Sequence, residues 1–216
     1  MSIESTAGVV LRLRPLTETS LIVNWLTRDF GRIATVAKGA RRPKSPFRGQ
    51  IDLFYVADFS FSRSRRSDLH TLRETRLLES NAGLRTDLGS LRQASYFAAL
   101  IEQTTEPETP LPALFARFAR LLRQLQNQPP NPQTVFGFEM KLLEDLGLTP
   151  KLGEARLTPG SRRILEKLLE MDWPAICQLR PSAAQATEIR QFLHGFLIYH
   201  IEKIPKGRNR ALGCDA

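Results

Sequence analysis

The chain has 216 residues, of which 42% are apolar and 25% are charged, a composition typical of a globular protein that can bury its own core. Its formal net charge of +9 favours partners that carry dense negative charge, such as nucleic acids or anionic membranes. Its two cysteines are too few for a secreted disulfide scaffold, and no apolar run reaches the length of about 18 residues that predicts a membrane-spanning helix. We therefore expect one or two domains in the reducing cytoplasm, without a signal peptide or membrane contact.

The first 80 residues have the alternating pattern of short β-strands. Apolar and polar side chains alternate in most of the candidate segments. The segment Ser20–Thr27 differs, because it is rich in β-branched residues and apolar on both faces, as in a central strand. The five candidate strands cover residues 9–14, 20–27, 32–38, 51–61 and 70–77. Five short strands within about 80 residues predict a small closed β-barrel.

After residue 80 the apolar residues recur with the period of a helix. Ser90 and Ser182 each have the spacing of a capping box, and Asn131-Pro132 is a typical helix start. The expected helices run from Ser90, from Thr109-Pro110, from Asn131 to about Gly147, over Ile164–Met171, and from Ser182 to about Lys203. The predicted fold class is α+β, with a barrel domain over residues 1–80, a helical domain over residues 81–204 and a flexible basic tail over residues 205–216.

A strongly basic stretch lies between the third and fourth candidate strands. Residues 37–49, AKGARRPKSPFRG, contain five Lys or Arg and no Asp or Glu, and we call them the basic loop. Basic surfaces on small barrels follow the backbone of nucleic acids, so these cations are candidate phosphate contacts. The alternative is a solvated loop that only aids solubility. The absence of acids between Gly31 and Gln50 favours binding, because mixed charges would serve solubility as well.

The candidate binding residues extend beyond this loop. Phe47 in the loop and Phe54 on the polar face of its strand are candidates for stacking on bases, with core packing as the alternative. The candidate phosphate contacts are Arg12, Arg14, Arg32, Lys38, Arg41, Arg42, Lys44, Arg48, Arg63, Arg65 and Arg66.

Metal binding and catalysis find little support in the sequence. Cys177 and Cys214 are far apart and have no CxxC partner, while His194 and His200 lie on different faces of their helix. There is no glycine-rich phosphate loop and no GxSxG elbow, and the acidic residues are scattered. We therefore predict no metal, no cofactor and no enzymatic activity.

Several segments together resemble the RecO family of bacterial recombination mediators. AKGARRPKS is the most specific of them. The resemblance is strong over residues 8–50, looser to about residue 150 and weak beyond. The segments that carry it are Gly8–Leu11, Glu18–Ile22, Leu26–Gly31 and Ala37–Arg42, followed by Phe138–Leu143 and Leu146–Pro150.

The resemblance implies an N-terminal OB-fold barrel followed by a helical domain. It implies binding of single- and double-stranded DNA, ATP-independent annealing of complementary strands, and association with the nucleoid. The implied partners are RecR, the acidic C-terminal tail of the single-strand-binding protein and, indirectly, RecA. Lys38, Arg41, Arg42 and Lys44 are the matched residues that would face DNA. Many family members carry a four-cysteine zinc module after the segment that matches Leu146–Pro150, but residues 151–163 contain no cysteine here, so we expect none.

Together these observations predict a nonenzymatic DNA-binding mediator that anneals strands and helps to load a recombinase in DNA repair. Two alternatives stay open. One is an RNA-binding OB-fold module, which competition between DNA and RNA would reveal. The other is a nuclease or nucleotidyl transferase, which incubation of labelled DNA with divalent metal would reveal.

Overall fold

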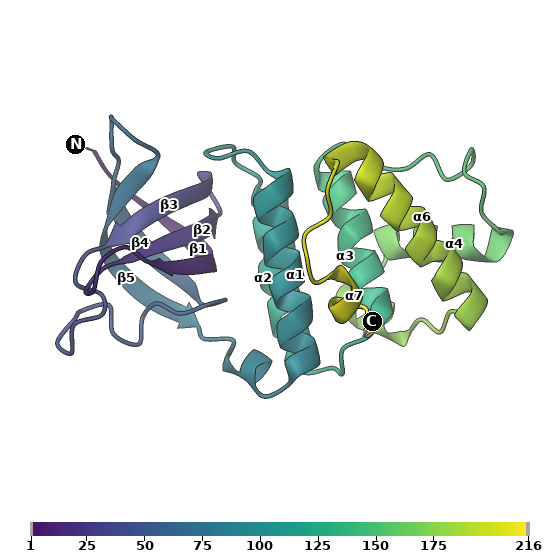
Figure 1. Ribbon diagram of the computed structural model, residues 1–216, viewed down its shortest axis with the longest axis horizontal. Helices are drawn as coiled ribbons and strands as arrows, with labels where there is room; N and C mark the ends of the chain where they lie inside the picture. The colour runs from purple at the N-terminus through teal and green to yellow at the C-terminus, as the bar shows by residue number, and fades with distance from the viewer. Residues whose placement is uncertain (1, 215–216) are drawn as a thin grey trace. The chain divides into compact units, whose positions relative to one another are not determined.

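A computed structural model of the protein describes residues 2–214. The chain divides into two compact units that alternate along the sequence (Figure 1). The first unit combines Met1–Ala82 with Thr105–Arg123, and the second combines Gly83–Thr104 with Gln124–Ala216. A single boundary near residue 80 therefore describes only part of the division, because the chain leaves the first unit, forms one helix of the second, and returns.

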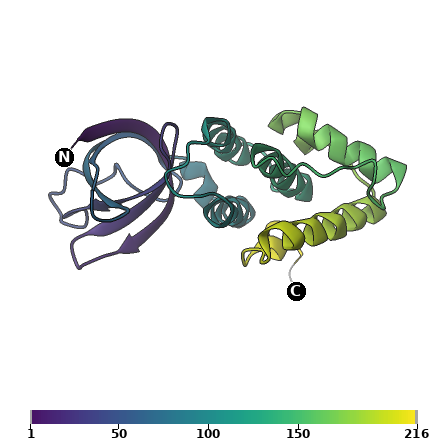
Figure 2. The same cartoon turned by 90° about the horizontal axis from the view of Figure 1, so that it is seen from above.

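Five strands of the first unit close into a barrel, which Figure 2 shows as a ring. They are β1 (Ile3–Pro15), β2 (Leu21–Thr27), β3 (Gly31–Ala37), β4 (Val56–Ser62) and β5 (Leu69–Glu79). The strand order is β1-β2-β3-β5-β4; β3 and β5 are parallel, and the other pairs are antiparallel. This is the topology of an OB-fold, so the predicted five-stranded barrel and the α+β fold class are confirmed.

Aromatic side chains fill the inside of the barrel. Trp25 stacks on Phe59 with ring centroids 4.2 Å apart, and its indole Nε1 donates a hydrogen bond of 2.9 Å to Thr35 Oγ1. The backbone of β1 passes so close to these rings that a Cβ on Gly8 would lie 2.8 Å from Phe59 and 3.2 Å from Trp25. Glycine is required there because any side chain would displace the aromatic core.

The fourth strand begins later than its alternating sequence predicts. β4 starts at Val56, and residues 51–55 form a turn instead. The Asp52 side chain accepts a 2.7 Å hydrogen bond from the Leu53 amide, the Asp52 carbonyl accepts one from the Tyr55 amide, and Phe54 has φ +65°. The prediction of a strand from residue 51 was wrong because an aspartate that bonds its neighbouring backbone favours a turn.

The helices follow the predicted pattern in most places. They are η1 (Ala82–Arg85), α1 (Leu88–Thr104), α2 (Pro112–Leu125), α3 (Pro132–Asp145), α4 (Pro159–Glu170), α5 (Trp173–Gln178), α6 (Ala183–Ile201) and α7 (Arg208–Ala211). Asn131 caps α3, and the capping box at Ser182 is present, as predicted. The cap of α1 is Asp87 rather than Ser90. Its carboxylate accepts a 2.6 Å hydrogen bond from the Ser90 amide, which lowers the pKa of Asp87. Within residues 2–214, no helix is long and apolar enough to cross a membrane.

The C-terminal segment is ordered by a buried ion pair. Arg208 in α7 is 5% exposed and Glu139 in α3 is fully buried; their Nε–Oε1 and Nη2–Oε2 distances are 2.7 and 2.8 Å. The Tyr96 hydroxyl donates a 2.7 Å hydrogen bond to Glu139 Oε1. Burial and the Glu139 carboxylate raise the pKa of Tyr96, so the phenol stays protonated and remains a donor. The prediction of a flexible tail was therefore wrong for the segment that contains α7, while residues 215–216 lie outside the described residues.

Replacing Arg208 with Ala should lower the free energy of unfolding by about 3–5 kcal/mol, because it leaves the Glu139 carboxylate buried without its counter-ion. Urea unfolding followed by tryptophan fluorescence measures this loss. Arg163→Ala, at an exposed position of α4, is the control and should change stability by no more than about 0.5 kcal/mol. The triple variant Y96F/E139L/R208M removes the three polar side chains of this network together and should recover most of the stability. A triple variant as unstable as Arg208→Ala would contradict the electrostatic explanation.

Candidate nucleic-acid interface

The basic loop forms the first part of the connection from β3 to β4 and consists of a series of tight turns. The Arg42 amide donates to the Gly39 carbonyl at 3.0 Å, the Ser45 amide to the Arg42 carbonyl at 3.0 Å, and the Arg48 amide to the Ser45 carbonyl at 3.2 Å. Gly39 and Gly49 have φ of +70° and +71°, the left-handed region that glycine adopts without strain. The loop is therefore a folded element with its own backbone hydrogen bonds.

Contacts with the barrel hold the basic loop in place. Phe47 is 7% exposed and packs in the core cluster of the barrel with Trp25 and Phe59. At the other end of the loop, the Arg41 amide donates a 3.0 Å hydrogen bond to the Thr19 carbonyl in the β1–β2 turn. Because the loop is attached at both places, the side chains between them project from a fixed backbone.

The cations of the basic loop are available for a ligand. All five are exposed, and among residues 2–214 none of them forms an ion pair. Arg48 Nη1 donates only to the Pro43 carbonyl, at 3.2 Å. These cations are Lys38, Arg41, Arg42, Lys44 and Arg48. Glu18 in the adjacent β1–β2 turn is exposed and contributes one negative charge, so the loop and this turn together remain strongly positive.

Two arginines on β1 extend this positive surface across the outside of the barrel. Leu13 packs against the core, so Arg12 and Arg14 on either side of it point outward, and both are exposed. Arg14 is paired with Ile22 of β2, and Ile22 is paired with Val36 of β3, two residues before Lys38. The outer face of β2 and β3 is the surface with which OB-folds bind oligonucleotides. The basic loop therefore lies at the edge of that face.

Arg32 is committed to a contact within the protein. Its Nη2 donates a 2.6 Å hydrogen bond to the Thr105 carbonyl, and its Nε donates one of 2.8 Å to Thr105 Oγ1. The Glu108 amide donates to the Arg32 carbonyl at 2.9 Å, and Pro107 pairs with Arg32 in a β-bridge. The segment 105–109 thus covers the start of β3. The prediction of Arg32 as a phosphate contact is corrected, because its guanidinium holds this segment.

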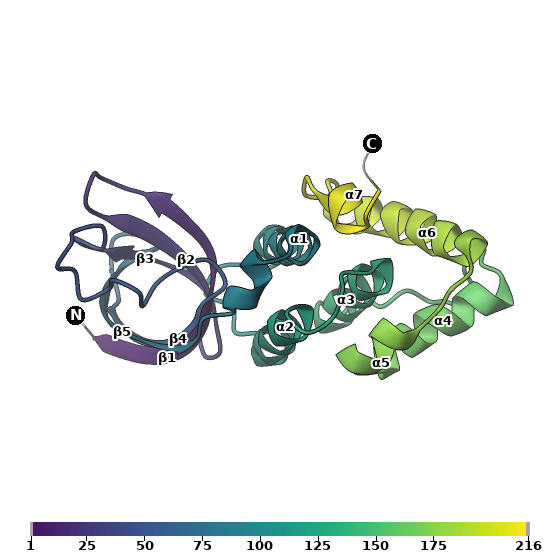
Figure 3. The ribbon, with the colours of Figure 1, turned by 90° about the horizontal axis from the view of Figure 1, so that it is seen from below.

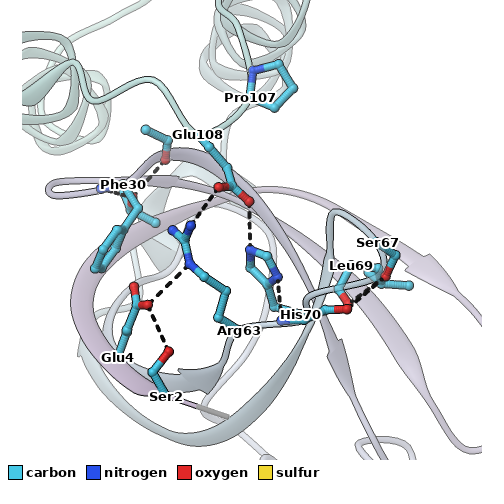
Figure 4. A network of polar contacts seen from close by, with 12 residues as sticks. Ser2, Glu4, Phe30, Arg63, Ser67, Leu69, His70, Pro107 and Glu108 are labelled. Atoms are coloured by element: carbon cyan, nitrogen blue, oxygen red, sulfur yellow. Dashed lines mark hydrogen bonds and ion pairs between the residues drawn. The ribbon is translucent and has the colours of Figure 1, made fainter.

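Arg63 is occupied by two carboxylates of the chain itself (Figure 4). Its Nε lies 3.2 Å from Glu4 Oε1, and its Nη1 lies 2.9 Å from Glu108 Oε2. The other Glu108 oxygen lies 3.1 Å from Nε2 of His70, a buried residue whose ring stacks on Phe61. Arg63 therefore helps to attach the segment 105–109 to the barrel, and these two ion pairs make it a weaker candidate for a phosphate contact than the cations of the basic loop.

The remaining predictions divide between exposed and buried side chains. Arg65 and Arg66 are exposed in the β4–β5 turn and stay candidates. The stacking role of Phe47 and Phe54 is corrected, because both rings are buried and a base cannot reach them. The Phe54 carbonyl accepts a 2.8 Å hydrogen bond from Asn81 Nδ2, which helps to fix this strained turn. Phe54 breaks the alternating pattern because it belongs to the turn rather than to a binding face.

Thr105 and Glu108 are the functional neighbours that sequence reasoning missed. Thr105 is 73 positions from Arg32, and Glu108 is 45 positions from Arg63. No motif or periodicity links residues so far apart. Only the return of the chain from α1 to the barrel brings them together.

Comparison with known proteins places the chain in a family. The family described as "Recombination protein O N terminal" matches residues 1–81, and "Recombination protein O C terminal" matches residues 85–155. The chain belongs to the RecO family. The predicted resemblance is confirmed, and the two matched regions together cover most of the chain.

Curated relatives named DNA repair protein RecO agree with this assignment. The chain is 36% identical to the protein of Bacillus subtilis over 146 residues, which are 67% of this chain and 56% of the relative. It is 32% identical to the protein of Listeria monocytogenes serotype 4b over 71% of this chain and 60% of the relative. It is 34% identical to the protein of Alkaliphilus metalliredigens over 68% of this chain and 59% of the relative. The chain thus spans somewhat more than half the length of these relatives.

In this RecO-family chain, the family match ends shortly after α3. The segment 151–163, which has no cysteine, contains most of the connection between α3 and α4 and the first residues of α4, and α4 to α7 lie beyond the matched region. Among residues 2–214, no group of three His, Cys, Asp or Glu side chains is arranged to hold a metal ion. Hydrogen bonds connect the start of α4 to α6. Glu188 in α6 accepts hydrogen bonds from Ser161 Oγ, from Thr158 Oγ1 at 2.7 Å and from the Thr158 amide at 2.8 Å, and these bonds lower the pKa of Glu188.

Replacing Phe47 with Ala should release the basic loop, because its ring is the apolar anchor of the loop in the barrel core. We expect a loss of about 3 kcal/mol in the free energy of unfolding and much faster tryptic cleavage after Arg41, Lys44 or Arg48. Mass spectrometry of the first fragments identifies the cleaved bonds. Phe97→Ala is the control, because it leaves a comparable cavity in the second unit. Equal loop cleavage in both variants would show that Phe47 does not order the loop.

Proposed function

We propose that this RecO-family chain is a nonenzymatic DNA-binding protein of recombinational DNA repair. In this proposal it binds single-stranded DNA through the basic loop and the outer face of β2 and β3, anneals complementary strands, and helps to load a recombinase. The observation that carries the proposal is the set of five exposed cations on a fixed loop, with no ion pair to any of them among residues 2–214. The relatives' name, DNA repair protein RecO, supports the cellular role.

The proposed mechanism is electrostatic. Two complementary strands repel each other through their phosphates, and each strand carries condensed counterions. Lysine and arginine side chains that replace those counterions lower the repulsion and gain free energy from the released ions. Since the contacts are to the backbone, binding should depend little on base sequence. No nucleotide hydrolysis is needed, which agrees with the absence of a Walker motif from the sequence.

Family membership also supports partners for the protein. We propose that it acts on the nucleoid with a RecR-like partner, contacts the acidic tail of the single-strand-binding protein, and acts indirectly on RecA. Double-stranded DNA is a further proposed ligand, because the same cations would contact the phosphates of a duplex.

The triple variant R41A/R42A/K44A should weaken binding of a labelled single-stranded oligonucleotide about 50-fold at 0.15 M salt, from about 0.7 released counterions for each of three lost contacts. The slope of log K against log salt, about −3 to −4 for the natural protein, should become less steep by about 2 units. Fluorescence anisotropy over a salt series measures both. The matched control R28A/R73A/R76A removes three exposed arginines that are bonded to Asp29, Ser62 and Asp58. Its slope should stay close to that of the natural protein. Equal slopes in the two triple variants would reject the loop as the binding site.

Annealing of two complementary labelled strands without ATP tests the activity itself. Energy transfer between the labels should rise faster with the natural protein than without it, and R41A/R42A/K44A should lose most of this acceleration. Tighter binding of RNA than of DNA of the same sequence would favour an RNA-binding module instead. Cleavage or extension of labelled DNA in Mg²⁺ or Mn²⁺ would show an enzyme.

A further inference from the structure

A second basic surface lies at the C-terminal end of the second unit. Of the 12 residues from Lys203 to Cys214, 4 are Lys or Arg, and none is Asp or Glu. The segment lies outside the regions that match the RecO family, so family membership assigns it no role. It folds back beside the end of α6 and contains α7 (Figure 3).

Three polar contacts, two of them buried and the one from Gln103 exposed, hold the backbone of this segment. The Gln93 side chain in α1 is 1% exposed and donates a 3.0 Å hydrogen bond to the Ala211 carbonyl. The Gln103 side chain, further along α1, donates to the Lys203 carbonyl. Between these two points, the Arg208 guanidinium is bound to Glu139. The segment is therefore attached at both ends and in the middle, so its other cations project from a fixed backbone.

The fixed segment encloses a pocket of about 490 Å³ with α6. His194 of α6, Lys206 and Arg210 are among the residues that line it, and all three are exposed. Among the described residues, no Asp or Glu lines this pocket, and neither Lys206 nor Arg210 forms an ion pair. Arg190 lies one helical turn before His194 on α6, and its Nη1 donates to Cys214 Sγ at 3.3 Å. Arg190 therefore adds one positive charge on α6, about one helical turn from the pocket residue His194.

We propose that Arg190, His194, Lys206 and Arg210 form a second binding site for the backbone of a nucleic acid, which holds the second strand during annealing. This inference rests on the proposed function. A protein with only one site for a DNA strand would have to release the first strand before it could bind the second. A protein with two such sites can hold both strands at once. Three cations, Arg190 on α6 and Lys206 and Arg210 in the C-terminal segment, lie in and beside a pocket that no Asp or Glu among the described residues lines, and such a group suits several phosphates better than a single anionic group.

The test compares the double variant K206A/R210A with the natural protein. Both residues are exposed, and neither takes part in the Arg208–Glu139 ion pair. The variant should bind a first single-stranded oligonucleotide within about twofold of the natural affinity. It should bind the second oligonucleotide about tenfold more weakly at 0.15 M salt, from about 0.7 released counterions for each of two contacts, and should anneal complementary strands more slowly as a result. Anisotropy titration measures the stoichiometry, and energy transfer between labelled strands measures the annealing rate.

Two controls keep the result specific. K206R/R210K preserves both charges and should keep the natural stoichiometry and rate. R156A/R163A removes two exposed arginines from the same unit, outside this pocket, and should behave like the natural protein. Far-ultraviolet circular dichroism and urea unfolding confirm that each variant is folded.

The outcomes separate this inference from the proposed function. Natural stoichiometry and annealing in K206A/R210A would overturn the second site and leave the basic loop as the DNA-binding surface. A natural protein that binds no DNA would overturn both proposals. If K206A/R210A still binds two oligonucleotides but loses affinity for a fluorescent peptide rich in aspartate, the pocket docks a protein and the inference is overturned.

Discussion

The burial of Phe47 in the barrel core is the contact on which the candidate site depends. A stretch with five cations would repel itself and fluctuate if only water surrounded it, whereas burying one phenyl ring contributes about 2–3 kcal/mol toward a fixed loop. In the sequence, Phe47 lies between Lys44 and Arg48. The attachment of its ring to the core therefore restrains the charged residues on both sides of it. The loop backbone that carries these cations is then already ordered by the fold, so a ligand that binds them does not have to meet the free-energy cost of ordering it.

The different environments of the arginines show why charge alone does not define a binding surface. Arg41 and Arg63 are identical in chemistry, but Arg63 lies between Glu4 and Glu108, while no carboxylate of the described residues pairs with Arg41. An arginine already paired with a carboxylate would have to give up that ion pair before it could replace a counterion on DNA. The segment 105–109 creates this distinction, because it brings Thr105 and Glu108 to the barrel and occupies Arg32 and Arg63 there.

The sequence predicted the features that depend on local chemistry and missed those that depend on distant contacts. Alternation and caps identified five strands and most helices, because side-chain period and local hydrogen bonds act over a few residues. The start of β4 was misplaced because Asp52 forms a local turn that an apolar pattern does not reveal. The order of residues 205–214 was missed because it depends on Glu139 and Gln93, which are 69 and 118 positions from their partners Arg208 and Ala211. The basic loop was found because its charge is concentrated in one short stretch.

The two basic surfaces are ordered in the same physical way. In the first unit, Phe47 turns inward from a basic segment, and in the second unit Arg208 does so. In both segments one residue is committed to the interior, and its charged neighbours in sequence remain exposed on a fixed backbone. For Arg208 this arrangement depends on Glu139, since a guanidinium is buried only where a carboxylate compensates for its lost hydration. Glu139 lies on α3, within the region that matches the RecO family, whereas Arg208 lies beyond it. The carboxylate of the matched helical region thus sets the position of a basic segment outside that region.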